Sequence, residues 1–390
     1  MSPQLISLSP DLRKLQAEGY EVSIETGHLL VRNVPYVKSD RTVARGTLVS
    51  TLSMSGNKTN RPDTHTIMFT GEFPCDQHGN AIEAIRNSEL NAKIGKLQVR
   101  HRFSSKPKDG YADYYEKMST YASILAGPAA FLQPGSTPQT FQIVEAEEES
   151  PFVYFDNASG RAGISEITAK LSGYSAAIVG LGGTGSYLLD LLAKTPVRSI
   201  HLFDDDSFEQ HSAFRAPGAP SLESLQEKPK KVDYLGSIYA QMHKGIVKRD
   251  TKITNENAQS LKVFDVVFVC VDNPAARESI VSALEDSNVT FIDTGMGVDI
   301  VDGKLIATLR TTSSLPDARE SARSRNRIPI GKNRKNDPYS SNIQVAELNA
   351  LNACFAIIKW KKLIGFYHDA EEELFSLYVL DGNSLINEAG

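Results

Sequence analysis

The chain has 390 residues, of which 41% are hydrophobic and 23% charged, and its formal net charge is −5. This length suits two domains, and the composition is typical of a globular protein. The slight acidic excess disfavours nucleic acid as a partner, because phosphate binding needs a concentrated basic face. No apolar run approaches the roughly 20 residues that cross a bilayer, so no membrane partner is expected.

The three cysteines of the chain, Cys75, Cys270 and Cys354, lie far apart. Such spacing forms neither a disulfide framework nor a paired-cysteine zinc site, so a reducing, cytoplasmic setting is expected. Cys270 and Cys354 fall in apolar segments, where free cysteine packs as a small hydrophobe. Cys75 stands close to His78 and is the candidate for an activated nucleophile, although an incidental pair is the simpler interpretation.

Residues 1–145 show the pattern of a small α+β domain. A helix is expected at 9–18, because Ser9 is a good N-cap and Pro10 suits the first helical position. A second helix is expected at 110–127, where several tyrosines share one face and should pack in the core. The acidic run at 145–150 is the predicted linker. Short β-branched segments predict strands at 20–26, 28–37, 42–54, 65–73 and 97–103.

The pattern changes near residue 170, where apolar strands begin to alternate with helical segments. This alternation predicts a doubly wound, mostly parallel α/β sheet covered on both faces, in a second domain at 151–390. Residues 311–342 interrupt it and are expected to be a flexible loop, whose basic part could also grip an acidic protein. An apolar helix is predicted at 343–366. The predicted strands lie at 174–180, 198–206, 264–273 and 288–295.

A glycine-rich loop with the sequence GLGGTGS follows the first of these strands and opens a helix. Its glycines fit the dinucleotide fingerprint, in which the backbone turns tightly and approaches a phosphate that the helix N-terminus attracts. Asp204 ends the second strand, where a carboxylate can accept hydrogen bonds from ribose hydroxyls. These features suit NAD, FAD and ATP equally. The candidate loop residues are Gly180, Gly182, Gly183, Gly185 and Ser186.

Charged residues later in the chain separate these cofactors. Asp206 and Arg215 follow the second strand, Lys231 comes soon after, and the third strand ends at Asp272 and Asn273. A triphosphate needs cations around it, and Mg²⁺ needs a hard oxygen ligand that leaves several waters in place. A dehydrogenase needs none of these groups. The set therefore predicts ATP and Mg²⁺.

This ordered set of motifs resembles the adenylation domain of ubiquitin-activating enzymes. It is equally similar to the bacterial enzymes that activate sulfur-carrier proteins in molybdopterin and thiamine synthesis. The motifs are GLGGTGS, then Asp204 and Asp206 followed by Arg215, then CVDN with Arg277. The resemblance spans roughly residues 155–380. It implies a Rossmann-like homodimer that adenylates the C-terminal glycine carboxylate of a ubiquitin-like or sulfur-carrier protein, with ATP and Mg²⁺.

The resemblance also implies roles for individual residues. The aspartate that holds the ribose in that family falls on Asp204, and the cations that contact ATP phosphates fall on Arg215 and Lys231. The Mg²⁺ ligand falls on Asp272. An arginine that the family supplies from the dimer mate falls on Arg161. The implied catalytic residues are thus Arg215, Lys231, Asp272 and Arg161.

Two departures from the family pattern limit this interpretation. Ser212 stands where the family has an asparagine, so that polar contact would be shorter or lost. Residues 295–345 contain no cysteine, so the enzyme is expected to stop at the acyl-adenylate. A non-catalytic scaffold subunit and an NAD-dependent dehydrogenase remain open. The domain at 1–145 is expected to recruit the partner protein, and the helix at 343–366 could form the dimer face.

Overall fold

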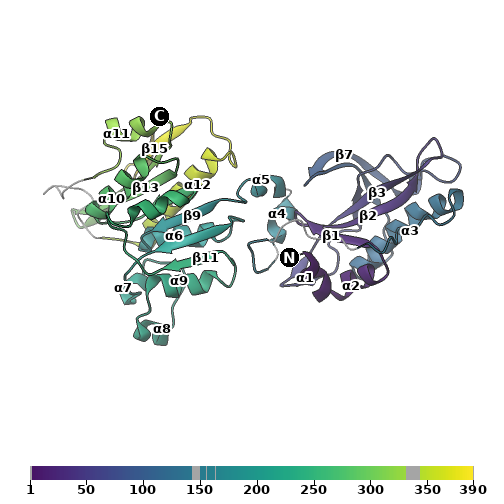
Figure 1. Cartoon of the computed structure of the whole chain (residues 1–390), viewed down its shortest axis with the longest axis horizontal. Helices are drawn as coiled ribbons and strands as arrows, with labels where there is room; N and C mark the ends of the chain where they lie inside the picture. The colour runs from purple at the N-terminus through teal and green to yellow at the C-terminus, as the bar shows by residue number, and fades with distance from the viewer. Residues whose placement is uncertain (1, 143–149, 155, 163, 331–342, 390) are drawn as a thin grey trace. The chain divides into compact units, whose positions relative to one another are not determined.

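The computed structural model describes residues 2–142, 150–154, 156–162, 164–330 and 343–389. Two compact units divide the chain, Met1–Ala169 and Lys170–Gly390 (Figure 1). Most of the predicted linker, residues 145–149, lies outside the described residues. The short helices α4 (Asn157–Ala162) and α5 (Ser165–Ala169) group with the first unit.

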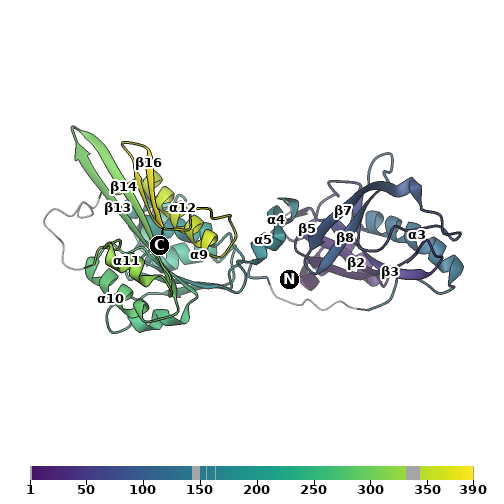
Figure 2. The same ribbon diagram turned by 90° about the horizontal axis from the view of Figure 1, so that it is seen from above.

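A six-stranded antiparallel sheet with the order β1-β2-β3-β6-β8-β7 forms the centre of the first unit. Helix α3 (Tyr114–Leu132) lies along this sheet (Figure 2). Its tyrosines Tyr114 and Tyr121 pack in the core, as predicted. The strands are β1 (Glu21–Glu25), β2 (His28–Val37), β3 (Val43–Thr51), β6 (Thr66–Phe69), β7 (Arg86–Ile94) and β8 (Leu97–Ser104). The smaller elements are α1 (Ser2–Leu8), α2 (Pro10–Ala17), β4 (Met54–Ser55), β5 (Lys58–Thr59) and η1 (Glu83–Ile85).

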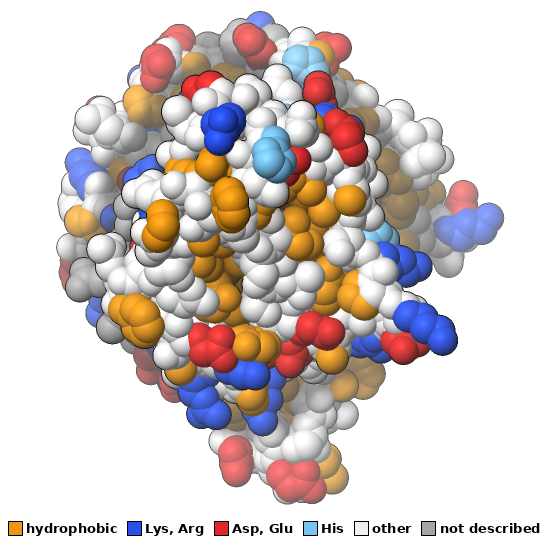
Figure 3. All heavy atoms as spheres, turned by 90° about the vertical axis from the view of Figure 1, so that its right-hand side faces the viewer, with side chains coloured by type: hydrophobic (Ala, Val, Ile, Leu, Met, Phe, Trp, Pro, Cys, Tyr) orange, Lys and Arg blue, Asp and Glu red, His pale blue; other side chains and the backbone are white. Residues whose placement is uncertain are grey.

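The helix expected at 9–18 is confirmed as α2, which follows Ser9 and has Pro10 at its first position. Strand β7 was not predicted, because its sequence RNSELNAKI is mostly polar and most of its residues are exposed. Hydrophobic side chains also reach the surface of this unit, among them Phe131 at 72% exposure. In Figure 3 such side chains gather between charged ones on the face turned to the viewer.

Lys117 is a charged residue at the centre of the first unit's core. Its side chain is fully buried, and its Nζ donates hydrogen bonds to Ser50 Oγ at 2.9 Å and to the Thr64 carbonyl at 2.8 Å. Burial disfavours the charged amine and lowers the pKa of Lys117 from 10.5 to about 8. The first unit therefore becomes more stable as the pH rises from about 8 towards 10.5, because over that window the unfolded chain binds more protons.

The second unit is built on an eight-stranded sheet with the order β11-β10-β9-β12-β13-β14-β15-β16. Strands β9 to β13 pair in parallel, and β13 to β16 extend the sheet in antiparallel fashion. The parallel strands are β9 (Ser175–Val179), β10 (Ser199–Phe203), β11 (Ile246–Arg249), β12 (Val266–Val269) and β13 (Thr290–Val301). The others are β14 (Lys304–Ser314), β15 (Glu373–Val379) and β16 (Ser384–Ala389).

Helices cover both faces of this sheet, as the apolar strands predicted. Alternate residues of β9 show this, because Ala176 and Ile178 pack into one core while Ala177 and Val179 pack into the other. One face carries α6 (Gly183–Leu192), α9 (Lys231–Tyr239) and α12 (Ala346–Leu363), and the other carries α10 (Pro274–Glu285), α11 (Arg319–Ser324) and η2 (Ala258–Val263). Two short helices are α7 (Gln210–Ala213) and α8 (Leu222–Glu227). The doubly wound α/β class is therefore confirmed.

The loop predicted at 311–342 is partly regular structure. Its first residues continue β14 as far as Ser314, and α11 forms soon after, while residues 331–342 lie outside the described residues. The predicted apolar helix is confirmed as α12, which packs against α6 and β13 within its own unit. In the described part of the chain, no helix is long and apolar enough to cross a membrane.

Replacing Lys117 by Met should remove the pH dependence described above. We expect the unfolding free energy of the native chain to rise relative to that of Lys117→Met, by up to about 3 kcal/mol between pH 7 and 10.5. Urea unfolding followed by circular dichroism measures it, with exposed Lys108→Met as the matched control. A difference that stays constant over this pH range would contradict the assignment.

Candidate functional site

The strand order of the second unit reverses at β9, the first strand of its parallel sheet. Strand β9 lies between β10 and β12, so the chain leaves β9 towards one side and returns on the other. The loops after these neighbouring parallel strands therefore diverge at their carboxyl ends, which is where open α/β sheets bind ligands. The glycine loop follows β9, Asp204 follows β10, and Asp272 follows β12 soon after its end. The predicted residues thus meet at this edge.

Three glycines shape the loop between β9 and α6, each for a different reason. Gly180 has a φ of +92°, a conformation that L side chains rarely adopt. A Cβ on Gly185 would stand 1.9 Å from the Gly180 carbonyl oxygen, so only glycine lets α6 approach the strand this closely. A Cβ on Gly182 would meet nothing within 4 Å. The backbone at Gly182, the N-cap of α6, is therefore open to a ligand.

Asp204 joins the second strand to the glycine loop. Its Oδ2 accepts a hydrogen bond from the Leu181 amide at 2.7 Å, and its Oδ1 accepts one from the Asp206 amide at 2.9 Å. Burial raises the pKa of Asp204, and the nearby Lys231 ammonium opposes that rise. The carboxylate has further lone pairs beyond these two bonds, so it fixes the loop and can still accept from a ligand.

Lys231 lies between the two aspartates that follow β10. Its buried Nζ is 2.6 Å from Asp206 Oδ2 and 3.5 Å from Asp204 Oδ1. The hydrogen bond from Lys231 lowers the pKa of Asp206. Sequence reasoning placed Lys231 on a phosphate and left Asp206 without a partner. In the structure the lysine instead pairs with these carboxylates.

Arg215 and Ser212 carry buried polar atoms that remain open. Within the described residues, neither Arg215 Nε nor Ser212 Oγ has a hydrogen-bond partner. The two residues lie close together after β10, since the Arg215 amide donates to the Ser212 carbonyl at 3.2 Å. Leaving buried polar groups unsatisfied costs free energy, so these atoms are candidates to bind a ligand.

Asp272 and Asn273 follow β12 and differ in their surroundings. Asp272 is exposed and makes no hydrogen bond or ion pair to any described residue. Asn273 caps α10, because its side chain accepts from the amides of Ala275 at 2.9 Å and Ala276 at 3.1 Å. The carboxylate of Asp272 is therefore available to a metal or ligand, whereas the side-chain oxygen of Asn273 already stabilises a helix start.

A buried carboxylate with two arginines supports this loop from beneath. Asp293 on β13 is fully buried and pairs with Arg277 Nε at 2.9 Å and with an Arg310 nitrogen at 2.5 Å. Arg277 also donates to the Val271 carbonyl, directly before Asp272. The sequence grouped Arg277 with the ATP-binding motifs, but in the structure its guanidinium is bound to protein groups and positions the loop.

Helix α12 contributes two asparagines that sequence reasoning missed. Asn349 packs against Gly183, and its Oδ1 accepts a hydrogen bond from Thr184 Oγ1 at 3.0 Å. Asn352 Nδ2 lies 3.4 Å from the same hydroxyl and 3.4 Å from the Gly295 carbonyl. The signal was two asparagines three residues apart in a mostly apolar helix. Ser186, a predicted ligand residue, bonds through its hydroxyl to the Gly183 carbonyl at 2.7 Å within α6.

The three thiols are poorly suited to nucleophilic attack. Burial raises the pKa of Cys75, and it raises the pKa of Cys270 to about 12 and that of Cys354 above its ordinary value. All three thiols are therefore protonated near pH 7. The predicted dimer-mate residue Arg161 lies in α4, and its side chain falls outside the description.

The fold and the loops at this edge define a doubly wound α/β domain, and comparisons with known proteins show what it is similar to. Residues 157–327 match the ThiF family model, and residues 10–157 match the model described as Domain of unknown function (DUF6791). The second part of the chain is thus similar to the ThiF family over residues 157–327.

Curated relatives with the name ubiquitin-like modifier-activating enzyme 5 match part of the chain. The one from Caenorhabditis briggsae is 24% identical over 208 residues, covering 50% of this chain and 48% of that protein. The one from Gallus gallus is 26% identical over 156 residues, covering 37% of this chain and 39% of that protein. The chain therefore spans about half the length or less of these relatives.

Solved structures with a similar fold come from Escherichia coli. MccB with ATP has 15% identity and a TM-score of 0.45, covering 60% of this chain and 72% of that one. The tRNA N6-threonylcarbamoyladenosine dehydratase TcdA in complex with AMP has 16% identity and a TM-score of 0.38, covering 53% of this chain and 92% of that one.

Alanine substitutions at two of the loop glycines should separate the fold from ligand binding. Gly182→Ala adds a methyl group to open space, so the melting temperature should stay unchanged while ATP binding weakens at least about fivefold. Gly185→Ala forces the strand and helix apart, so it should destabilise the second unit by at least about 1–3 kcal/mol. Thermal unfolding and ATP titration measure both. Normal ATP binding by the Gly182→Ala variant would show that ATP does not approach the backbone at Gly182.

The carboxylate of Asp293, which pairs with Arg277 and Arg310, should be critical for the stability of the second unit. Asp293→Asn leaves two buried guanidinium groups without a countercharge, so the free energy of unfolding should fall by about 3–5 kcal/mol. Trp360, the single tryptophan, is buried in this unit and reports its unfolding in urea. Asp302→Asn, at an exposed turn, is the matched control and should change little. A loss below about 1 kcal/mol would contradict the role given to Asp293.

Proposed function

We propose that the chain adenylates the C-terminal glycine carboxylate of a ubiquitin-like or sulfur-carrier protein, giving an acyl-adenylate and pyrophosphate. The observation that carries this proposal is a pair of charged groups without partners in the segments that follow β10 and β12. Arg215 keeps a buried Nε without a partner, and Asp272 presents an unpaired carboxylate at the same sheet edge, both judged among the described residues. A bound nucleotide with its metal would satisfy both.

ATP fits the residues at this edge. The open backbone at Gly182 and the N-terminus of α6 suit the phosphates, because amide groups and the helix dipole attract anions. Asp204, fixed against the loop, would accept hydrogen bonds from the ribose. Arg215 and Ser212 would bind phosphate oxygens through the atoms that are otherwise unsatisfied.

Mg²⁺ fits the single carboxylate of Asp272. In the described part of the chain no cluster of three or more metal-binding side chains occurs. That agrees with the chemistry of Mg²⁺, which is usually held by one or two carboxylates, by substrate phosphates and by several waters. When bound, Mg²⁺ supplies positive charge that stabilises the negative charge developing on the phosphate oxygens.

The protein's contribution to the reaction would be positional and electrostatic. The partner's terminal carboxylate is ionised near pH 7, so no general base is needed. One carboxylate oxygen forms a bond to the α-phosphorus as the bond to pyrophosphate breaks. Arg215 would stabilise the charge on the phosphates, with Lys231 and an Arg161 from a second copy adding to it. The raised thiol pKa values support a reaction that ends at the acyl-adenylate.

The first unit would recruit the partner protein. Its exposed phenylalanines, Phe131 at 72% and Phe141 at 75%, support this assignment, because aromatic side chains on the surface are common in binding sites. A homodimer is part of the proposal, since Arg161 would act on the neighbouring copy. Helix α12 exposes Ile358, at 41%, as a contact that such a dimer could cover.

Two nucleotide probes test the proposal without knowledge of the partner. Calorimetry of the full chain should show binding of ATP with Mg²⁺ and of glycyl-sulfamoyl-adenosine, a stable mimic of a glycyl-adenylate. Asp272→Asn should weaken ATP·Mg²⁺ binding at least about tenfold, which is about 1.4 kcal/mol. The same variant should bind the sulfamoyl compound almost as the native chain does, because that compound has no triphosphate and needs no Mg²⁺.

Asp302→Asn serves as the matched control and should leave both affinities unchanged. Adenosine sulfamate without the glycyl group should bind more weakly than the glycyl compound, because it lacks the acyl part. Binding of NAD that ignores Asp272 would replace the proposal by the dehydrogenase alternative. A chain that binds neither ATP·Mg²⁺, nor the glycyl compound, nor NAD would support the scaffold alternative.

A further inference from the structure

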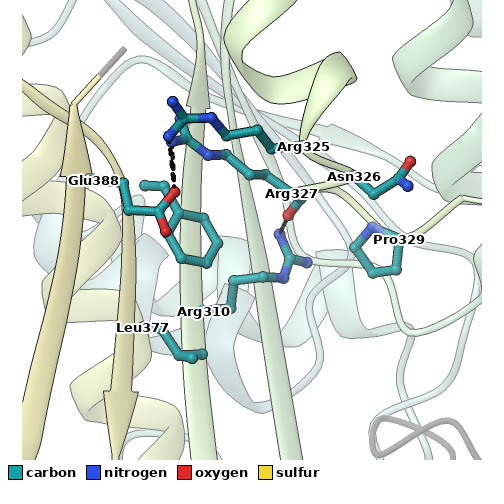
Figure 4. A pocket seen from close by; sticks show the side chains of 8 residues that line it. Arg310, Arg325, Asn326, Arg327, Pro329, Leu377 and Glu388 are labelled. Atoms are coloured by element: carbon teal, nitrogen blue, oxygen red, sulfur yellow. Dashed lines mark hydrogen bonds and ion pairs between the residues drawn. The ribbon is translucent and has the colours of Figure 1, made fainter.

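A second polar site lies on the antiparallel end of the sheet in the second unit. It is an open pocket of about 330 Å³ (Figure 4). The side chains that matter for its chemistry are Arg310, Arg325, Arg327, Phe375, Leu377 and Glu388. None of them belongs to the candidate nucleotide site.

The pairing of β14, β15 and β16 places four of these side chains next to one another. Arg310 on β14 is paired with Leu377 on β15, and Phe375 on β15 is paired with Glu388 on β16. Directly paired residues point to the same face of a sheet, so these four side chains share one face. The segment after α11 forms the opposite wall, and Arg327 lies over the Phe375 ring, 5.4 Å from its centre.

Three guanidinium groups face one carboxylate in this pocket. Arg327, with a side chain 3% exposed, and Arg325 both donate to Glu388 Oε2, at 2.7 Å and 3.1 Å. Arg310 is buried and pairs with Asp293 beneath the floor, and it also donates to the Arg327 carbonyl at 2.8 Å. Glu388 Oε1 contacts no described residue. Among the described residues, the lining of the pocket thus holds three arginines and one carboxylate, that of Glu388.

The contacts of Glu388 show that the arginines of this pocket can bind a carboxylate. It comes from β16, which lies at the end of the strand order and pairs only with β15. Its side chain is 43% exposed, so it can move away without opening a packed core. A planar carboxylate matches the guanidinium fork, and the apolar walls of Phe375 and Leu377 suit the carbon stem of an acidic side chain.

We propose that this pocket binds an acidic side chain of a peptide segment from a partner protein, with Glu388 holding the place of that carboxylate in the free chain. A peptide suits the site because β16 is an edge strand whose outer backbone groups are open to pairing. Ile386 on the same strand is 47% exposed and is paired with Leu377, so an apolar residue beside the acidic one would also find a contact.

Fluorescence anisotropy on the full chain tests the proposal in the absence of ATP, so its outcome is independent of the proposed adenylation. The probe is a fluorescein-labelled peptide of the sequence Gly-Leu-Glu-Leu-Glu-Leu-Gly, and its control has Gln in place of both Glu residues. We expect the acidic peptide to bind and the Gln peptide to bind at least about tenfold more weakly, which corresponds to the loss of a charge-assisted pair. Binding should weaken with added salt.

Two variants in the pocket should shift the affinity in opposite directions. Arg325→Gln, at an exposed position, should weaken binding at least about fivefold. Glu388→Gln should strengthen it at least about threefold, because the internal carboxylate no longer competes. Arg323→Gln is the matched control, since Arg323 pairs with Glu285 outside the pocket. Thermal unfolding checks that each variant is folded.

Weaker or unchanged binding in Glu388→Gln would overturn the proposal, because a merely structural Glu388 predicts that result. Equal binding of the two peptides would also overturn it, since an edge strand alone would then explain the affinity. Binding of inorganic phosphate with no binding of the acidic peptide would assign the pocket to a small anion instead.

Discussion

The second unit depends on one buried carboxylate at the seam of its sheet. Asp293 lies on β13, the strand that pairs in parallel with β12 on one side and in antiparallel fashion with β14 on the other. A carboxylate without a countercharge would be costly there, and the two arginines remove that cost. Arg277 on α10 also donates to the Val271 carbonyl in the loop that carries Asp272. Arg310 on β14 also lines the pocket described above, which contains Glu388. The segment before Asp272 and the pocket are thus both connected to the carboxylate of Asp293, through Arg277 and Arg310.

The sequence predicted the fold well where local pattern and tertiary structure agree. Buried parallel strands are apolar throughout, so β9, β10, β12 and β13 were found in order and in type. Strands β7 and β14 were missed for a physical reason. The first is an exposed edge strand with a polar sequence, and the second is rich in Ser and Thr that bury between β13 and β15. Neither position can be known before the neighbouring strands are placed.

The sequence named candidate site residues but not the contacts that the structure gives them. The glycine loop and Asp204 meet as expected, because strand ends and fixed motif spacing place them at one edge. The partners of Lys231 and Arg277 could not be foreseen. Each charge finds a carboxylate from another part of the chain, and such contacts depend on the packing of helices α9 and α10. Asn349 was missed likewise, because α12 joins the glycine loop only through the folded core.

These pairings also decide how the charges around the loop can act. The buried Lys231 pairs with the exposed Asp206 at 2.6 Å and with the buried Asp204 at 3.5 Å, so moving it to a phosphate would leave the buried Asp204 without this countercharge. Such a break is costly unless the incoming group replaces the lost partner. Arg215 carries an unsatisfied buried nitrogen and needs no such exchange. Within the proposed reaction, Arg215 is therefore the cation that meets the phosphates first. In that proposal Lys231 pairs with Asp206 and Asp204 in the free chain and adds to the positive charge near the phosphates.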